Sequence, residues 1–223
     1  MALSIYGIIV LIAYLGLSSA IARRAAETGK CGILKSALTP LLIVFFLLES
    51  GGAHLLPGNG GRIFIIIALS FGCAGDTLLE ISEEGKPLVF GLGSFLAGHV
   101  FYILAAVSDI RPEKLTLLFL IGAVPYVLLF IRVVRTILPS VPREMKAPVV
   151  LYMTVIILMS YSMLLRTGSV SLSSALICLA GSSFFILSDV LLALHVFKGR
   201  VFQGVMETYT AAQLLLTCGF LFS

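Results

Sequence analysis

Long apolar segments separated by short connections constrain the fold of this chain more than any other feature. Each is close to the roughly 20 residues that an α-helix needs to cross a bilayer. Eight can be placed in the 223-residue sequence, with approximate bounds 3–22, 34–50, 61–81, 87–107, 114–136, 147–166, 173–197 and 201–222. None alternates as the strands of a membrane barrel do. The sequence therefore predicts an all-α bundle of eight transmembrane helices, forming a single integral membrane domain over residues 1–223.

The composition supports the same class of protein. Hydrophobic residues make up 59% of the chain and charged residues only 12%, and the mean hydropathy is +1.12. Because about 25% of the residues in a soluble domain are charged, a soluble globule, a disordered chain and a nucleic-acid binder are excluded as main interpretations. The net charge of +4 is explained instead by the distribution of charge across a membrane.

The positions of Lys and Arg residues predict the orientation. Arg23 and Arg24 follow the first segment and no positive charge precedes it, so we interpret it as a retained helix and not as a cleaved signal peptide. If the segments cross alternately, eleven of the fifteen Lys and Arg residues, Lys35 included, lie on one side. Cytoplasmic loops carry such an excess. We therefore expect both termini on the non-cytoplasmic side of a bacterial cytoplasmic membrane.

Two of the segments share the short pattern S-F-x-x-x-[GS]-D-x-L-L, which begins at Ser70 and again at Ser183. The copies are 113 residues and four segments apart, so both run in the same direction across the membrane. This is compatible with a parallel 4+4 internal repeat, although chance agreement is easy in a chain so rich in Leu and Phe. Each copy contains one aspartate, Asp76 or Asp189.

These two aspartates are the strongest candidates for functional residues. A charged side chain at the centre of a transmembrane helix costs about 2.5–3.5 kcal/mol on insertion scales and is by default functional. Each follows a small residue, Gly75 or Ser188, which lets another helix approach. The alternative is that both aspartates only join helices by hydrogen bonds. Glu80 shares a helical face with Asp76, but an interfacial position is slightly favoured for it.

Other polar residues in the predicted helices have helical spacing. His99 and Tyr102 share a face of the fourth segment, Tyr209 and Gln213 share a face of the eighth, and Tyr152 lies in the sixth. Such groups often only join helices, but together with the aspartates they predict one polar cavity that opens toward the cytoplasmic leaflet. The sequence contains no HExxH, Walker or dinucleotide-binding pattern, and it predicts no metal site.

At these residues the sequence resembles the YhhN-like lysoplasmalogenase family. The second segment matches least, because the family often has a Lys-Pro pair where this chain has Lys35-Ser36. The matching pieces run in order over about two-thirds of the chain: Gly75-Asp76, Gly91-x3-Phe95-x3-His99-x2-Tyr102, Tyr152 through Met159, Leu187-Ser188-Asp189-x2-Leu192-Ala193, and Thr208-Tyr209-x-Ala211-Ala212-Gln213-Leu214-Leu215.

The resemblance implies hydrolysis of the vinyl ether bond of lysoplasmalogens to a fatty aldehyde and glycerophosphoethanolamine or glycerophosphocholine, without a metal or organic cofactor. It implies a lysophospholipid and bilayer lipids as partners and leaves the oligomeric state open. The chemistry requires an acid and an anion that stabilises an oxocarbenium ion, roles that two carboxylates can divide. The sequence does not assign which of Asp76 and Asp189 is the acid. Residues expected to position water or substrate are His99, Tyr102, Tyr209, Gln213, Tyr152, Ser188 and Glu80.

Two other functions remain open at this point. A proton-coupled or lipid transporter also uses paired membrane acids in a duplicated bundle. A non-catalytic membrane scaffold is the third possibility, and it predicts that both aspartates can become asparagine without loss of activity. Release of aldehyde in detergent, where no compartments exist, distinguishes a hydrolase from a transporter.

Overall fold

The computed structural model describes residues 3–28, 32–51, 61–81, 85–200 and 204–223, which form helices joined by short connections. These residues contain no β-strand, so the all-α prediction is confirmed. A 3-10 helix, η1 (Ile33–Ala37), leads into the second α-helix. The α-helices of the described residues are α1 (Ile5–Thr28), α2 (Leu38–Glu49), α3 (Gly61–Ile81), α4 (Gly85–Asp109), α5 (Leu117–Ile137), α6 (Lys146–Leu165), α7 (Leu172–Lys198) and α8 (Val205–Leu221).

Six of these helices, α1 and α3 to α7, are long and apolar enough to cross a membrane, judged on the described residues alone. The chain is therefore a multi-pass membrane protein. The predicted segments 34–50 and 201–222 correspond to α2 and α8, which have only 12 and 17 residues. The second segment is shortened because its first turn is the 3-10 helix η1. Residues 201–203 lie outside the described part, so eight complete spans stay a prediction.

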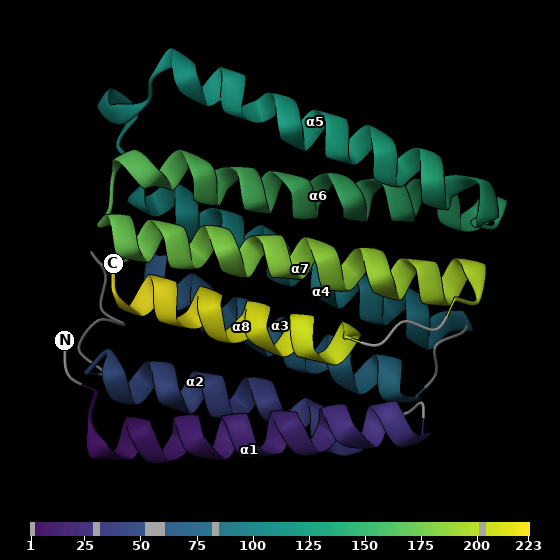
Figure 1. Ribbon diagram of the computed structural model, residues 1–223, viewed down its shortest axis with the longest axis horizontal. Helices are drawn as coiled ribbons and strands as arrows, with labels where there is room; N and C mark the ends of the chain where they lie inside the picture. The colour runs from purple at the N-terminus through teal and green to yellow at the C-terminus, as the bar shows by residue number, and fades with distance from the viewer. Residues whose placement is uncertain (1–2, 29–31, 52–60, 82–84, 201–203) are drawn as a thin grey trace.

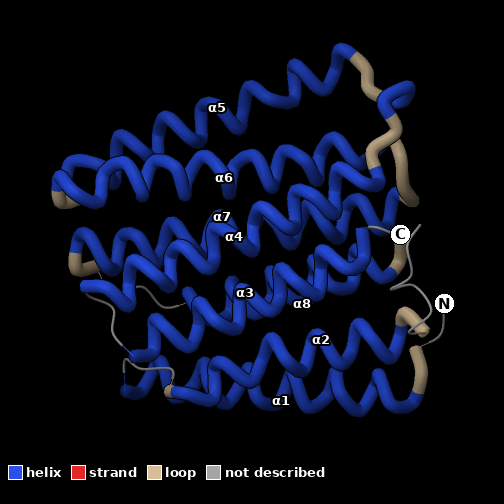
Figure 2. Tube along the Cα trace, turned by 180° about the vertical axis from the view of Figure 1, so that it is seen from behind, coloured by secondary structure: helices blue, strands red, loops and turns tan. Residues whose placement is uncertain are grey.

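The helices lie side by side, and successive α-helices run in opposite directions (Figure 1). Both termini lie at one end, called here the termini end, and the view from behind shows the same arrangement (Figure 2). The helices α3 and α7, which carry the two copies of the repeated pattern, run in the same direction. The proposed duplication and the side of the membrane on which the termini lie stay predictions.

Close helix contacts build the centre of the bundle. The most extensive are those of α3 with α4 and of α7 with α8. A Cβ atom at Gly75 would lie only 2.7 Å from the Phe95 ring, and one at Gly181 only 2.9 Å from the backbone nitrogen of Leu216. Glycine is therefore required at both positions for the helices to approach, and the first of them directly precedes Asp76.

The two edges of the bundle in Figure 1, α1 and α5, present apolar side chains to their surroundings. In α5 only Val133 and Ile137 are buried. An apolar surface of this extent marks contact with lipid or a partner, and lipid is the partner that fits six apolar helices of membrane length. The large exposed side chains of α5 are Leu117, Leu118, Leu120, Ile121, Val124, Val127, Leu128 and Ile131.

Candidate active site

Asp76 is completely buried in α3, and both of its carboxylate oxygens have partners. The Lys35 ammonium of η1 lies 3.0 Å from Oδ1, and the Tyr209 hydroxyl of α8 donates a hydrogen bond of 2.6 Å to Oδ2. The ammonium also lies 5.0 Å from the centroid of the Tyr209 ring. Three segments that are distant in the sequence therefore meet at one carboxylate.

A chain of hydrogen bonds continues from this carboxylate into the bundle. The Gln213 amide, one turn along α8, donates to the Tyr209 hydroxyl at 3.2 Å. The Tyr102 hydroxyl of α4 donates to the Gln213 amide oxygen at 2.7 Å. In each of these three hydrogen bonds the donor is the residue farther from Asp76, so all the protons point toward the carboxylate. We call Lys35, Asp76, Tyr102, Tyr209 and Gln213 the Asp76 cluster.

The position of η1 explains how Lys35 reaches Asp76. The Ser36 hydroxyl lies 3.0 Å from the Thr77 hydroxyl, and the Ser36 carbonyl accepts a bond of 3.2 Å from the Cys73 thiol. Both contacts hold η1 on the face of α3 that carries Asp76. The Lys35-Ser36 pair, at which the resemblance is weakest, is thus the segment that brings a cation to the aspartate.

Asp189 lies in a different environment, between α6 and α7. The Tyr152 hydroxyl donates to its Oδ2 at 2.5 Å, and both residues line a cavity enclosed mainly by α4, α5, α6 and α7. The other lining residues, among them Leu92, Phe130 and Ile156, are apolar. The cavity has a volume of about 60 Å³, whereas one water needs roughly 10–15 Å³. We call it the Asp189 cavity.

His99 lies between the two aspartates and is almost fully buried. Its ring centroid is 5.5 Å from that of Tyr152 and 4.8 Å from that of Phe185, and Phe185 is 5.6 Å from Tyr209. Among the described residues neither ring nitrogen has a hydrogen-bond partner of normal geometry, although the Phe95 carbonyl lies near the ring. A series of aromatic rings therefore connects the two carboxylates.

The structure divides the predicted cavity into two parts. Asp76 is fully buried and is not among the residues that line the Asp189 cavity, so the expectation of one cavity lined by both aspartates is wrong as stated. The Ser188 hydroxyl donates to the Val205 carbonyl at 3.2 Å, and within the described residues no hydrogen bond joins it to either part. Glu80 is half-buried and close enough to Asp76 to act on it electrostatically.

Lys35 lies in a different place from the one that the sequence predicts. It was counted among the loop charges, whereas its side chain is only 15% exposed and is paired with Asp76. Leaving it out of the loop count still leaves ten Lys and Arg residues against four. The signal that pointed to it was its position in the second segment, where the family often has a Lys-Pro pair.

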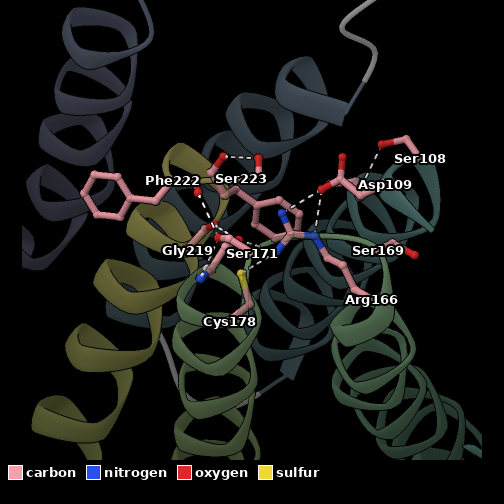
Figure 3. A network of polar contacts seen from close by, with 12 residues as sticks. Ser108, Asp109, Arg166, Ser169, Ser171, Cys178, Gly219, Phe222 and Ser223 are labelled. Atoms are coloured by element: carbon pink, nitrogen blue, oxygen red, sulfur yellow. Dashed lines mark hydrogen bonds and ion pairs between the residues drawn. The ribbon is translucent and has the colours of Figure 1, made fainter. Parts of the chain in front are cut away.

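A second buried ion pair, which the sequence did not indicate, lies at the termini end (Figure 3). The Arg166 guanidinium is fully buried; its Nε donates to Asp109 Oδ2 at 2.7 Å and its second nitrogen lies 2.6 Å from the same oxygen. It also donates to Ser174 at 3.0 Å and lies 4.3 Å from the Phe220 ring centroid. The Ser174 hydroxyl donates to the Gly219 carbonyl at 2.6 Å. We call these residues the Arg166 cluster.

In the part of the chain that the structure describes, no group of three or more His, Cys, Asp or Glu side chains is arranged to hold a metal ion. The groups that the described site offers are carboxyl, phenol, amide and ammonium groups. The Asp76 cluster provides a neutralised carboxylate, and the Asp189 cavity provides a carboxyl group beside apolar walls.

The fold and the site together define a multi-pass membrane protein that holds the carboxyl groups of Asp76 and Asp189 inside its helical bundle. Residues 32–220 match the model of the YhhN family. This range includes every candidate residue named above, and it covers most of the sequence. The chain belongs to the YhhN family, as its resemblance predicted. Neither a curated protein nor a solved structure matches the chain.

Proposed function

We propose that the protein is a hydrolase that cleaves the vinyl ether bond of lysoplasmalogens, releasing a fatty aldehyde and glycerophosphoethanolamine or glycerophosphocholine. One observation carries this proposal: Asp189 and Tyr152 are hydrogen-bonded to each other in a cavity whose other walls are apolar. Apolar walls suit an aliphatic chain, and a carboxyl group beside them can protonate the vinyl ether at the start of that chain. Membership of the YhhN family supports the same reaction.

The reaction needs one water and no oxidant or reductant. The Asp189 carboxyl gives its proton to the β-carbon of the vinyl ether, and a lone pair of the ether oxygen stabilises the oxocarbenium ion that forms. Water adds to the cationic carbon and returns a proton to Asp189. The resulting hemiacetal breaks its carbon–oxygen bond to give the aldehyde and the free glycerol hydroxyl. The volume of the Asp189 cavity leaves room for the water.

The two carboxyl groups have different roles in this mechanism. Asp189 lines the cavity and donates the proton, and as a carboxylate it then faces the cation that it has created. Asp76 is neutralised by the Lys35 ammonium at 3.0 Å, so it does not compete for the proton. The Asp76 cluster, which Tyr209 and the series of rings connect to the cavity, provides fixed charges and dipoles beside the reacting group. General acid catalysis contributes about 10²–10⁴-fold and such electrostatic support about 10²–10³-fold.

The test is incubation of the purified protein in detergent with a lysoplasmalogen and, separately, with its saturated ether analogue. Aldehyde is expected from the vinyl ether only, because protonation of a saturated ether cannot give the oxocarbenium ion. The matched control is Asp189→Asn, which keeps the size of the side chain and removes the acid. Absence of aldehyde with the active lipid would overturn the proposal, and movement of intact lysolipid across vesicles without aldehyde would establish the transporter instead.

A further inference from the structure

A second hollow lies next to the Asp189 cavity, at the end of the bundle opposite the termini. It is lined by the start of α4, the connection between α5 and α6, and the end of α7, and it has a volume of about 670 Å³. Three residues, Leu88, Val196 and Phe197, line both spaces. The hollow, called here the mouth, therefore adjoins the Asp189 cavity through a neck formed by these three side chains.

We infer that the mouth and the Asp189 cavity form one binding site for a single-chain lipid, with the phosphate-bearing headgroup in the mouth and the aliphatic chain extending inward past Asp189. This inference rests on the proposed function for the position of the reacting bond. It adds the direction of the lipid, the route by which it reaches the acid, and the side chains that limit its length.

The direction follows from where charge and apolar surface lie. The mouth is bounded by Gly85, the first residue of α4, and by Phe197, which lies one residue before the end of α7. The mouth therefore lies at the level of the helix ends, where a lipid headgroup meets water. Lys86 lines the mouth and is exposed, which provides a positive charge for the phosphate. Of the described residues that line the inner cavity, Asp189 alone carries a charged group.

The spacing along α7 matches the order of groups in a lysolipid. Phe197 at the neck and Asp189 are eight residues apart, which is about 12 Å along a helix. The vinyl ether of a lysoplasmalogen lies one glycerol unit away from the phosphate, and the flexible lysine side chain adds reach from the rim. Because one glycerol unit is shorter than this distance, the phosphate must lie at the neck side of the mouth, with the flexible Lys86 side chain following it inward, for the vinyl ether to reach Asp189. The chain continues toward the inner wall, which contains Ile156, Ile157 and Ile186.

The narrow inner space explains why a single chain is required. The mouth is about 670 Å³ and the inner cavity about 60 Å³, so side chains at the neck and inner wall must move to admit even one chain. A second chain would have to leave through the same neck. The size of the inner wall residues then sets the chain length that fits best.

The experiment compares a larger side chain at the inner wall with a larger side chain at the neck. Ile157→Phe adds bulk at the inner wall, and Val196→Phe adds it at the neck. Leu128→Phe, on the exposed face of α5, is the matched control. Each variant is assayed with lysoplasmalogens that carry an octenyl or a hexadecenyl chain, and kcat/KM is measured for both substrates.

Ile157→Phe is expected to lower the hexadecenyl-to-octenyl ratio of kcat/KM by about tenfold or more, the scale on which an apolar pocket discriminates chain size. Val196→Phe should raise KM for both substrates alike, and Leu128→Phe should change neither. If Ile157→Phe does not fold, Ile157→Ala enlarges the same wall and is expected to shift the ratio in the opposite direction. An unchanged ratio in the Ile157 variants, or a changed ratio in Val196→Phe alone, would overturn the inference.

Binding separates this inference from the proposed reaction. Saturated octyl and hexadecyl ether lysolipids are not cleaved, and their binding to the folded protein raises its melting temperature. Ile157→Phe should reduce the stabilisation by the hexadecyl lipid more than that by the octyl lipid. If Ile157→Phe has this effect on binding and the wild-type protein releases no aldehyde, the proposed reaction is wrong and the lipid site stands. If the wild-type protein releases aldehyde while Ile157→Phe reduces the stabilisation by the two lipids equally or not at all, only the lipid site is wrong.

Discussion

Two ion pairs lie in different parts of the bundle, Lys35–Asp76 and Arg166–Asp109, and they differ in what surrounds them. Arg166 joins the ends of helices: its partners lie at the end of α4, the start of α7 and, through Ser174 and Phe220, the end of α8. The Asp76 cluster joins side chains within α3, α4 and α8 instead. A series of aromatic rings leads from it to the Asp189 cavity.

The comparison shows that burial of a charge does not by itself indicate catalysis. A buried ion pair often adds no stability over a well-packed apolar pair, while removal of one partner alone is strongly destabilising. The position of each pair relative to a cavity distinguishes them. We therefore expect the Arg166 cluster to affect only stability, and the Asp76 cluster to affect both stability and turnover.

The largest expected effect is on the acid itself. Asp189→Asn should lower aldehyde release at least ~10²-fold, because an amide cannot act as the acid. Its melting temperature should not fall, since a neutral amide is easier to bury than a carboxylate. Thermal unfolding and aldehyde release are measured on the same preparation. A rate within a few-fold of the wild-type rate would mean that Asp189 is not the acid and only joins α6 and α7 by its hydrogen bond.

Asp76→Asn should also slow the reaction, by about 10²-fold, through lost electrostatic support. The double variant with Asp189→Asn should lose much less than the product of the two single losses, because groups that act as a unit are non-additive. Steady-state aldehyde release by the three variants gives the answer. Losses that multiply would mean that the Asp76 cluster acts independently of Asp189.

Removing one member of each ion pair tests the comparison most directly. Lys35→Met and Arg166→Met should each lower the free energy of unfolding by about 3–5 kcal/mol, with Arg166→Met near the lower value because Asp109 is 28% exposed. Only Lys35→Met should also lower kcat of the molecules that remain folded. Denaturant titration and aldehyde release per folded molecule are the measurements. Equal effects of both variants on kcat would remove the distinction between the two pairs.

Removing both members of a pair should restore most of the stability, because no uncompensated charge is left in the bundle. Arg166→Met combined with Asp109→Asn should then be stable and active. Lys35→Met combined with Asp76→Asn should be stable and should release aldehyde slowly. Lys35→Arg, which keeps the charge, is the conservative control and should retain more activity than Lys35→Met.

The smallest expected effect is at His99. Its ring packs against Tyr152 and Phe185 and, within the described chain, makes no hydrogen bond to either carboxylate. His99→Gln should therefore slow aldehyde release by less than about tenfold, below the range for general acid–base catalysis. A loss as large as that of Asp189→Asn would place the imidazole in the proton transfer itself.

The sequence predicted the apolar helices and pointed to most polar residues of the candidate site, because an aspartate or glutamine inside an apolar segment is conspicuous. It did not predict their partners, since Tyr209 lies 133 residues from Asp76 and no local spacing reports such a contact. Lys35 and Arg166 were treated as loop charges because hydropathy counts place every cation near a helix end in water. Tertiary packing decides otherwise, and it also separates Asp76 from the cavity that contains Asp189.

The order of the Asp76 partners along the chain has a consequence for biogenesis. Lys35 is synthesised before Asp76, whereas Tyr209 follows 133 residues later. Before α8 has been synthesised, an unpaired aspartate would raise the free energy of α3 in the bilayer by about 2.5–3.5 kcal/mol. The early ion pair compensates this charge, so the nascent chain can retain α3 in the bilayer until α8 arrives. We therefore expect the residue that neutralises the carboxylate in the finished protein to stabilise α3 during membrane insertion as well.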